Sequence, residues 1–350
     1  TRSTTVTGVQ TCALPICGER LMLAEMLTAS FLAGLLSASV RMATPIVFAA
    51  MGEVLVERSG VLNLGIEGIM LMGAVTGFLA TLQTGSLWTG ILVAAAVGLV
   101  FGLVMAFLAV YLGLSQHVSG LGLTLLSTGL AMYVYRLVVG APTVPPTITP
   151  FVKIAVPGLC KIPILGEMLF NQYALVYIAM VLVGLLWVFL YKTKWGLAVR
   201  TVGENPFAAD TVGIDVNLVR TLCLAVGGVL MGVGGAFLTL AHNNMFLLDI
   251  IGGRGWVAIA MVIFGWWDPV GATLGALMFG FLDALQLRIQ GMGVTIPFHL
   301  FLMIPYVVTI VALVIGSSSG AGAPAGLLKP YRREEKGGRS EEHTSELQSR

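Results

Sequence analysis

Residues 87–111 read LWTGILVAAAVGLVFGLVMAFLAVY, a long run without a single charged side chain. A helix needs about 20 predominantly apolar residues to cross the hydrocarbon core of a bilayer. The whole chain has this character, because 57% of its 350 residues are hydrophobic and only 10% are charged. Soluble domains carry about 25% charged residues. The composition therefore predicts an all-α protein, a polytopic bundle of transmembrane helices.

About ten stretches of the chain are long and apolar enough to be spans. Residues 251–267 and 270–287 are separated only by Asp268-Pro269, which predicts a tight turn. The weakest candidate, residues 43–55, is short and contains a proline, so we expect it to be tilted or broken. The other candidates are residues 22–40, 66–82, 87–111, 114–139, 173–191, 222–240 and 298–315.

Basic residues predict the orientation, because short cytoplasmic loops are enriched in Lys and Arg. The loop at residues 192–220 and the tail at residues 317–338 both carry several of them, so we expect both in the cytoplasm. With about ten spans, both ends of the chain then lie inside, and the proline-rich loop at residues 140–172 lies outside. The basic residues concerned are Lys192, Lys194, Arg200, Arg220, Lys329, Arg332, Arg333 and Lys336.

The two ends of the chain share an unusual relationship. Residues 6–16 read VTGVQTCALPI and residues 339–349 read RSEEHTSELQS. One nucleotide string can encode the first segment, and its reverse complement, read in another frame, encodes the second. That string resembles a common sequencing adapter. We therefore expect residues 1–17 and 339–350 to be assembly artefacts, and we place a membrane domain at residues 18–316 and a tail at residues 317–338.

The stretch at residues 52–70, GEVLVERSGVLNLGIEGIM, places polar side chains between strongly apolar flanks. A charge at the bilayer centre costs about 2.5–3.5 kcal/mol on insertion scales, so each must be paired, face water or lie near a surface. The simplest interpretation of Glu57-Arg58-Ser59-Gly60 is a solvated cytoplasmic turn. For Asn63 and Glu67 two roles stay open, lining a polar path or joining helices. Asp283 is the third candidate for such a path.

Within the basic loop, residues 205–219 can form a short helix. Asn205 is a suitable N-cap, and Pro206 suits the first helical position. Small and apolar residues follow at helical spacing. A helix of this kind either lies on lipid headgroups or docks on a partner.

Three segments together resemble one family. They are GEVLVERSGVLNLGIEGIM at residues 52–70, GENPFAADTVGIDV at residues 203–216 and GGRGWVAIAMVIFGWWDPVGATLGALMFG at residues 252–280. The combination resembles the permeases of branched-chain amino acid, simple-sugar and nucleoside ABC importers, over about residues 20–315. This implies a membrane-spanning subunit in a bacterial inner membrane that imports a nucleoside or simple sugar by alternating access. The implied partners are a cytoplasmic ABC ATPase, a second and different permease, and an extracytoplasmic solute-binding protein.

The resemblance also implies which residues contact the ATPase, because in this family the loop helix inserts into a cleft of that subunit. Ala208-Ala209 followed by Gly213 also resembles the coupling motif of other importers, but the acidic residue which that motif has just before the alanines is missing, since Phe207 stands there. The residues that match the coupling loop are Glu204, Asn205, Pro206, Ala208, Ala209, Asp210 and Gly213.

The chain lacks the motifs of an ATPase. A P-loop needs a Gly-Lys pair, and the sequence contains none. We therefore expect ATP to bind a separate subunit, and this chain to be no enzyme and to hold neither cofactor nor metal. The glycine-rich run at residues 252–255 predicts a helix-entry turn. The alternative function is an ion-coupled secondary transporter, which would need a relay of the intramembrane carboxylates Glu25, Glu53, Glu67 and Asp283.

Glycines and alanines four residues apart predict close packing of helices, because small side chains let two backbones touch. The pairs are Gly228 with Gly232, Gly271 with Gly275, and Ala276 with Gly280.

Overall fold

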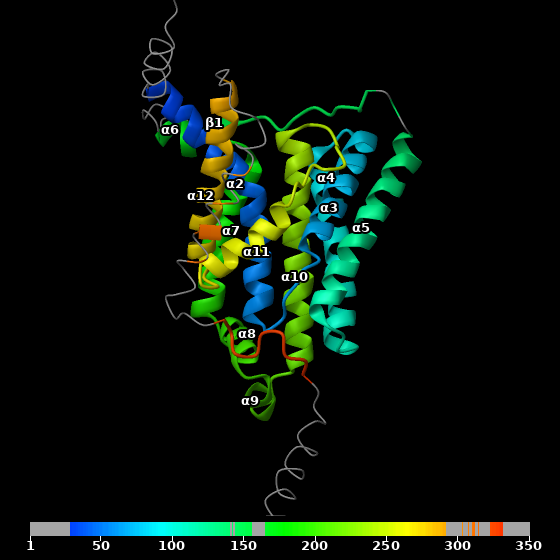
Figure 1. Ribbon diagram of the computed structural model, residues 1–350, viewed down its shortest axis with the longest axis vertical. Coiled ribbons are helices and arrows are strands. Elements are labelled where there is room, and N and C mark those ends of the chain that lie inside the picture. The colour runs from blue at the N-terminus through cyan, green and yellow to red at the C-terminus, as the bar shows by residue number, and fades with distance from the viewer. Residues whose placement is uncertain are drawn as a thin grey trace, which may run out of the picture.

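The computed structural model is an elongated helix bundle (Figure 1). It describes residues 29–140, 142, 144–155, 165–291, 303, 307, 310, 311, 314 and 323–331. The adapter-like ends, most of the predicted span at residues 298–315 and most of the predicted tail lie outside the described residues.

The described residues include seven helices that are long and apolar enough to cross a membrane. Their outer faces are apolar and exposed, as at Leu92 (69%) on α4 and Leu125 (75%) on α5, which suits contact with lipid. The predicted all-α, polytopic bundle is confirmed. The seven are α2 (Ala29–Arg58), α3 (Ile66–Thr84), α4 (Leu87–Ala106) with π-helical η1 (Phe107–Tyr111), α5 (Gln116–Val139), α7 (Ala174–Lys192), α10 (Val216–Phe237) with π-helical η3 (Leu238–His242), and α12 (Pro269–Gly291).

The first helix corrects the predicted count of spans. Residues 22–40 and 43–55 are not separate spans, because α2 runs unbroken from Ala29 to Arg58 with Pro45 inside it. Membrane helices tolerate an interior proline where neighbouring groups satisfy the freed backbone. As a result α2 begins and ends at opposite ends of the bundle (Figure 1). One end of α2 packs against α8 (Lys194–Glu204), and the first residue of α2, Ala29, lies at the other end.

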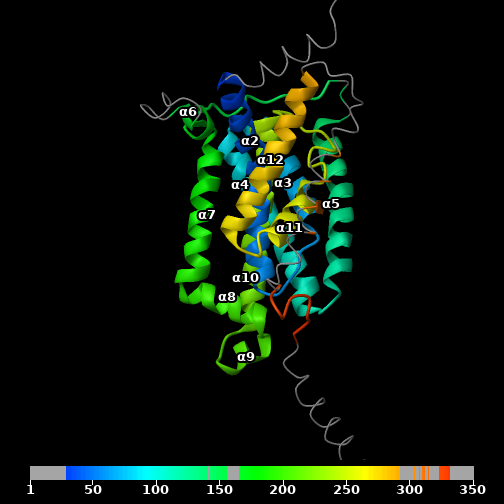
Figure 2. The ribbon, with the colours of Figure 1, turned by 60° about the vertical axis from the view of Figure 1, so that its left-hand side comes forward.

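A second correction concerns residues 251–267. The helix there, α11 (Arg254–Phe264), has 11 residues and is only about 16 Å long at 1.5 Å per residue, too short to cross. It is a half-helix that slants through the middle of the bundle (Figure 2). The tight turn at Asp268-Pro269 is confirmed. Asp268 Oδ2 accepts hydrogen bonds from the backbone N–H groups of Val270 (2.9 Å) and Gly271 (3.1 Å), and so caps α12.

The central helix is α10, which packs against α2, α3 and α4. Its contact with α4 depends on glycine, because a Cβ atom at Gly98 would collide with the carbonyl oxygen of Gly228, and one at Gly228 with that of Gly98. A Cβ atom at Gly280 would lie 2.6 Å from the Ser39 carbonyl oxygen of α2. The predicted role of these small residues in helix packing is therefore confirmed.

The two ends of the bundle differ. At one end lie α8, α9 (Pro206–Thr211) and the segment 323–331 (Figure 1). At the other end the chain after α5 runs as an extended connection, with a two-residue antiparallel pair, β1 (Ile154–Ala155) and β2 (Asn171–Gln172), and α6 (Leu165–Leu169). The basic loop and the described part of the tail thus share one end, opposite the proline-rich loop, as predicted. Which end faces the cytoplasm stays a prediction.

Candidate functional site

Between α2 and α3 the chain passes through the protein interior without forming a helix. Backbone polar groups away from water need partners, and here side chains supply them. For this link (residues 59–65), the N–H of Leu62 donates to Gln116 Oε1 at 2.8 Å and the N–H of Asn63 donates to Glu53 Oε1 at 2.9 Å. The Leu64 carbonyl oxygen accepts from the Thr124 hydroxyl at 3.2 Å. Non-helical backbone at membrane depth is typical of transporters.

Asn63 itself is fully buried. Its Oδ1 accepts from the N–H of Gly65 at 3.0 Å, and its Nδ2 lies 3.6 Å from the Met231 sulfur of α10. These contacts join the link to α10, and a role of Asn63 in lining a polar path stays a prediction.

The predicted solvated turn at Glu57-Arg58-Ser59-Gly60 is wrong. Glu57 is 1% exposed and Ser59 is fully buried. The turn that contains Trp267 covers this end of α2. The Arg58 guanidinium donates from Nε to the Trp267 carbonyl oxygen at 2.9 Å. The Trp267 indole N–H donates to the Glu57 carboxylate. The local sequence around Glu57 could not predict this burial, because the residues that cover it lie about 200 positions away in the chain.

Glu67 lies at the other end of α11. Its Oε1 accepts from the N–H of Gly253 at 2.9 Å, and its Oε2 accepts from the N–H of Gly255 at 2.8 Å. The first N–H groups of a helix have no partner inside the helix and carry partial positive charge, so a carboxylate there is stabilising. Gly253 has φ of 81°, a left-handed conformation that glycine adopts readily. The predicted helix-entry turn is confirmed.

Asp283 also reaches this end of α11. Its Oδ2 lies 3.2 Å from Nη2 of Arg254, the first residue of the half-helix, and both side chains are partly exposed (18% and 21%). Arg254 Nη1 also donates to the carbonyl oxygen of Ile251 at 3.1 Å. Two of the three predicted path residues, Glu67 and Asp283, therefore meet at one place, whereas Asn63 lies in the link.

The half-helix is thus held at both ends by residues 52–70. Glu67 binds its N-terminus, and Glu57 and Arg58 bind the turn that follows its C-terminus. In that turn Trp266 and Trp267 have φ of 53° and 57°, which is uncommon for bulky residues. Such backbone persists where surrounding contacts impose it, and it clusters at functional sites. We call this arrangement of α11, Glu57, Arg58 and Glu67 the clamp.

The loop after α7 forms the second candidate site. Asn205 is the N-cap of α9, and its Oδ1 accepts from the N–H of Ala208 at 3.0 Å. The predicted cap is confirmed, but the helix is shorter than predicted. It ends at Thr211, and Gly213 turns the chain with φ of 86° before α10 begins. Exposed residues at this end include Ala208 and Val212, the latter 72% exposed.

Not every predicted contact residue of this loop is at the surface. Pro206 and Ala209 are buried in the described structure, where they pack inside the loop. Contact of this loop with an ATPase stays a prediction. Glu204, Asn205, Ala208 and Gly213 are exposed, and Asp210 is intermediate. The Glu204 carboxylate accepts a hydrogen bond from the N–H of Ala325 at 3.2 Å, which ties it to the C-terminal segment.

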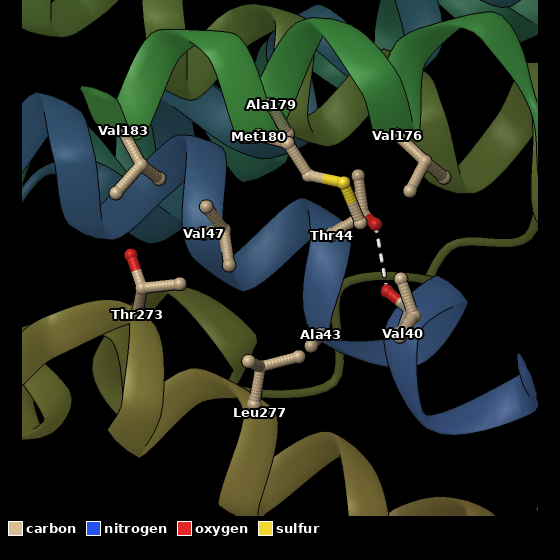
Figure 3. A pocket seen from close by; sticks show the side chains of 10 residues that line it. All are labelled: Val40, Ala43, Thr44, Val47, Val176, Ala179, Met180, Val183, Thr273 and Leu277. Atoms are coloured by element: carbon tan, nitrogen blue, oxygen red, sulfur yellow. Dashed lines mark hydrogen bonds between the residues drawn. The ribbon is translucent and has the colours of Figure 1, made fainter. Parts of the chain in front are cut away.

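A small cavity between α2, α7 and α12 is no candidate for a solute site (Figure 3). Its volume is about 70 Å³, whereas pockets for small molecules measure about 300–1,000 Å³. Apart from Thr44 and Thr273 its lining is apolar, so it is a packing defect. Among the described residues no cluster of His, Cys, Asp and Glu could hold a metal ion.

Two residues of these sites escaped sequence analysis. Trp267 was not singled out, and Arg220 served only to predict orientation. Arg220 is 2% exposed and lies in the first turns of α10. A cation so close to an apolar run is costly unless it is bound, and that signal could have marked it.

Comparison with known proteins gives one consistent result. Residues 35–313 match the family described as "Branched-chain amino acid transport system / permease component". A proposed glucose ABC transporter permease protein of Haloferax volcanii, TsgC13, is 40% identical, over 87% of this chain and 99% of its own length. The guanosine ABC transporter permease protein NupQ of Bacillus subtilis is 37% identical, over 83% and 93%. The nucleoside ABC transporter permease protein NupC of Lactococcus lactis is 37% identical, over 78% and 88%. No solved structure matches the chain.

Proposed function

The chain belongs to the family of permease components of branched-chain amino acid transport systems, and from this premise we propose that it imports an uncharged polar solute, a nucleoside or a simple sugar. It is a multi-pass membrane protein and a permease component of an ABC transporter. ATP is hydrolysed on a separate ABC ATPase, because the chain carries no P-loop. Solute moves through the membrane by alternating access.

One observation supports coupling to the ATPase above all others. Beyond the spans, the turn after α9 presents the apolar side chain of Val212, which is 72% exposed. An apolar group exposed outside the bilayer is typical of a protein contact. The basic residues of the loop favour a cytoplasmic position for this end, where an ATPase would dock. With α2 a single helix, Ala29 then faces the outside.

The clamp supports an uncharged solute. In transporters the N-terminus of a half-helix often receives the anionic group of a substrate. Here the Glu67 carboxylate already occupies the N-terminus of α11, with hydrogen bonds to Gly253 and Gly255. An amino acid's carboxylate therefore has no vacant anion site at this position. The names of the relatives, which give guanosine, nucleosides and glucose, point the same way.

The complete importer contains this chain, a second and different permease, two ATPase subunits and an extracytoplasmic solute-binding protein, in a bacterial plasma membrane. ATP binding closes the ATPase pair, α9 moves with it, and the spans around α11 reorient. The chain itself performs no covalent chemistry.

The solute class can be tested by ATPase stimulation of the complete importer in lipid nanodiscs. Guanosine, glucose and leucine are added in turn with the solute-binding protein. We expect guanosine or glucose to raise ATP hydrolysis and leucine to leave it unchanged. Stimulation by leucine alone would contradict the proposed solute class but would leave the coupling to ATP intact.

A further inference from the structure

The C-terminal segment at residues 323–331, which we call the strap, is bound to the coupling loop at three points. The N–H of Gly326 donates to the Gly203 carbonyl oxygen at 2.8 Å, and the N–H of Ala325 donates to the Glu204 carboxylate at 3.2 Å. The Tyr331 ring packs on that of Phe207 in α9, with centroids 5.2 Å apart. Any displacement of α8 and α9 therefore acts on the strap.

The strap is also close to the transmembrane part. Leu328 and Pro330 border a hollow of about 180 Å³ whose far side is formed by residues 113–117, which end the connection after η1 and begin α5. A Cβ atom at Gly326 would lie 2.7 Å from the Gly203 carbonyl oxygen, so strap and loop touch backbone to backbone. A Cβ atom at Gly60 would lie 3.2 Å from the Gly326 carbonyl oxygen. The link therefore packs closely against the strap as well, and the strap, the loop and the link form one junction.

Arg220 connects these parts. Its Nη1 donates to the Lys329 carbonyl oxygen of the strap at 3.2 Å, and its Nε donates to the Ser59 carbonyl oxygen of the link at 3.2 Å. The residue is 2% exposed. Within the described residues Arg220 forms no salt bridge. The ion pair found among those residues joins Arg254 and Asp283.

A buried cation without a carboxylate partner is costly, and an apolar side chain would fill the same space at lower cost. The two carbonyl partners of Arg220 belong to segments that contact different parts of the molecule. The strap leads to α9, and the link leads through Asn63 to Glu67, which binds the half-helix α11. A guanidinium can hold two such segments in fixed relation because its donors form a rigid fork.

We propose that Arg220 is the positioning residue that transmits movement of α9 to the link and the clamp, with the strap as the part that ties it to the coupling loop. This inference rests on the proposed function, because it requires an ATPase that moves α9. Arg220 touches neither solute nor ATP, and it acts through the link.

The test uses the complete importer in nanodiscs and compares ATP hydrolysis without and with solute-loaded binding protein. In Arg220→Gln we expect the complex to assemble and basal hydrolysis to continue, while the stimulated-to-basal ratio falls about tenfold, since hydrogen bonds to a charged group are lost. Arg220→Lys keeps the charge without the fork and should restore part of the ratio. The control is Arg136→Gln, which removes an exposed arginine from the end of α5 and should change nothing.

Since Arg220→Gln could prevent folding, Gly326→Val provides an independent perturbation of the same junction. The control for it is Gly184→Val, because a Cβ atom at Gly184 meets nothing within 4 Å. We expect Gly326→Val, like Arg220→Gln, to lower the ratio while the complex still assembles. Normal stimulation in Gly326→Val and in whichever Arg220 variant assembles would overturn the inference. A wild-type importer without any stimulation would instead contradict the proposed function.

Discussion

The Glu67 carboxylate accepts a hydrogen bond from the backbone N–H of Gly255 at 2.8 Å, although the two residues stand 188 positions apart in the chain. The contact joins residues 52–70 to the segment 252–280, so two segments that resemble the family separately form one structure. It also explains why a short helix can start inside the bundle, because its N–H groups have a partner.

Replacing Glu67 by Gln should destabilise the protein. The amide keeps one acceptor oxygen, but its NH₂ group would face an N–H donor, and the negative charge at the start of α11 is lost. We expect a loss of about 1–3 kcal/mol in the free energy of unfolding, measured by denaturation in mixed micelles. The control is Glu167→Gln in α6, where the side chain is exposed, and it should change stability by less than about 0.5 kcal/mol. Equal effects of both substitutions would contradict the capping role.

The two tryptophans of the turn after α11 offer a matched pair. Trp267 is 7% exposed and its indole N–H binds Glu57, whereas Trp266 is 49% exposed and contributes only its carbonyl oxygen to Arg58. Trp267→Phe leaves a buried carboxylate oxygen without its donor, so we expect it to cost about 1–3 kcal/mol in the same assay. Trp266→Phe should cost less than about 0.5 kcal/mol. If Trp266→Phe were the more harmful change, the clamp would be wrongly assigned.

The turns, caps and close helix contacts were the features that could be predicted from the sequence. Asn205 as a cap and Asp268-Pro269 as a turn were predicted correctly, because both depend on contacts within three residues. The paired glycines of α10 also packed as predicted, since close approach of two membrane helices leaves few other uses for them.

The errors share one physical cause. Hydropathy indicates that a segment is buried in lipid or in protein, but it does not show whether the helix spans the bilayer. The apolar composition of α11 therefore fits a full span and a half-helix equally well. Pro45 indicated a break, yet α2 continues through it and packs against α10 and α12. Membrane helices tolerate such a proline where neighbouring groups satisfy the freed backbone. The burial of Glu57 depends on Trp267, a partner 210 positions away, so no local pattern could disclose it.

The glycine contact between α4 and α10 predicts a large effect from a small change. Gly98→Val places a side chain where the Gly228 backbone lies, so the helices must separate. Overpacking of this kind costs about 1–3 kcal/mol, and the melting temperature of the detergent-solubilised protein should fall. Gly184→Val, on α7 with nothing near its Cβ position, serves as the control and should leave the melting temperature unchanged. Equal melting of the two variants would argue against close packing here.

The exposed apolar residue after α9 predicts where the ATPase binds. Val212→Glu should weaken binding of the purified ATPase subunit at least about tenfold, because it buries an unpaired carboxylate in the contact. Val144→Glu changes a valine of similar exposure, 77% against 72%, in the extended connection after α5. This connection lies at the end of the bundle opposite α9 (Figure 1), so the variant should bind the ATPase normally. Biolayer interferometry with the permease in nanodiscs measures both. Normal binding by Val212→Glu would remove this turn from the ATPase contact.

Transport by the complete importer in proteoliposomes tests the central claim most directly. ATP is enclosed on the side of α9, the solute-binding protein with labelled guanosine or glucose is supplied on the other side, and accumulation is followed with time. We predict accumulation that requires ATP, stops when vanadate blocks the ATPase, and continues in the presence of a proton ionophore. Accumulation that proceeds without ATP and collapses with the ionophore would show an ion-coupled transporter and contradict the account.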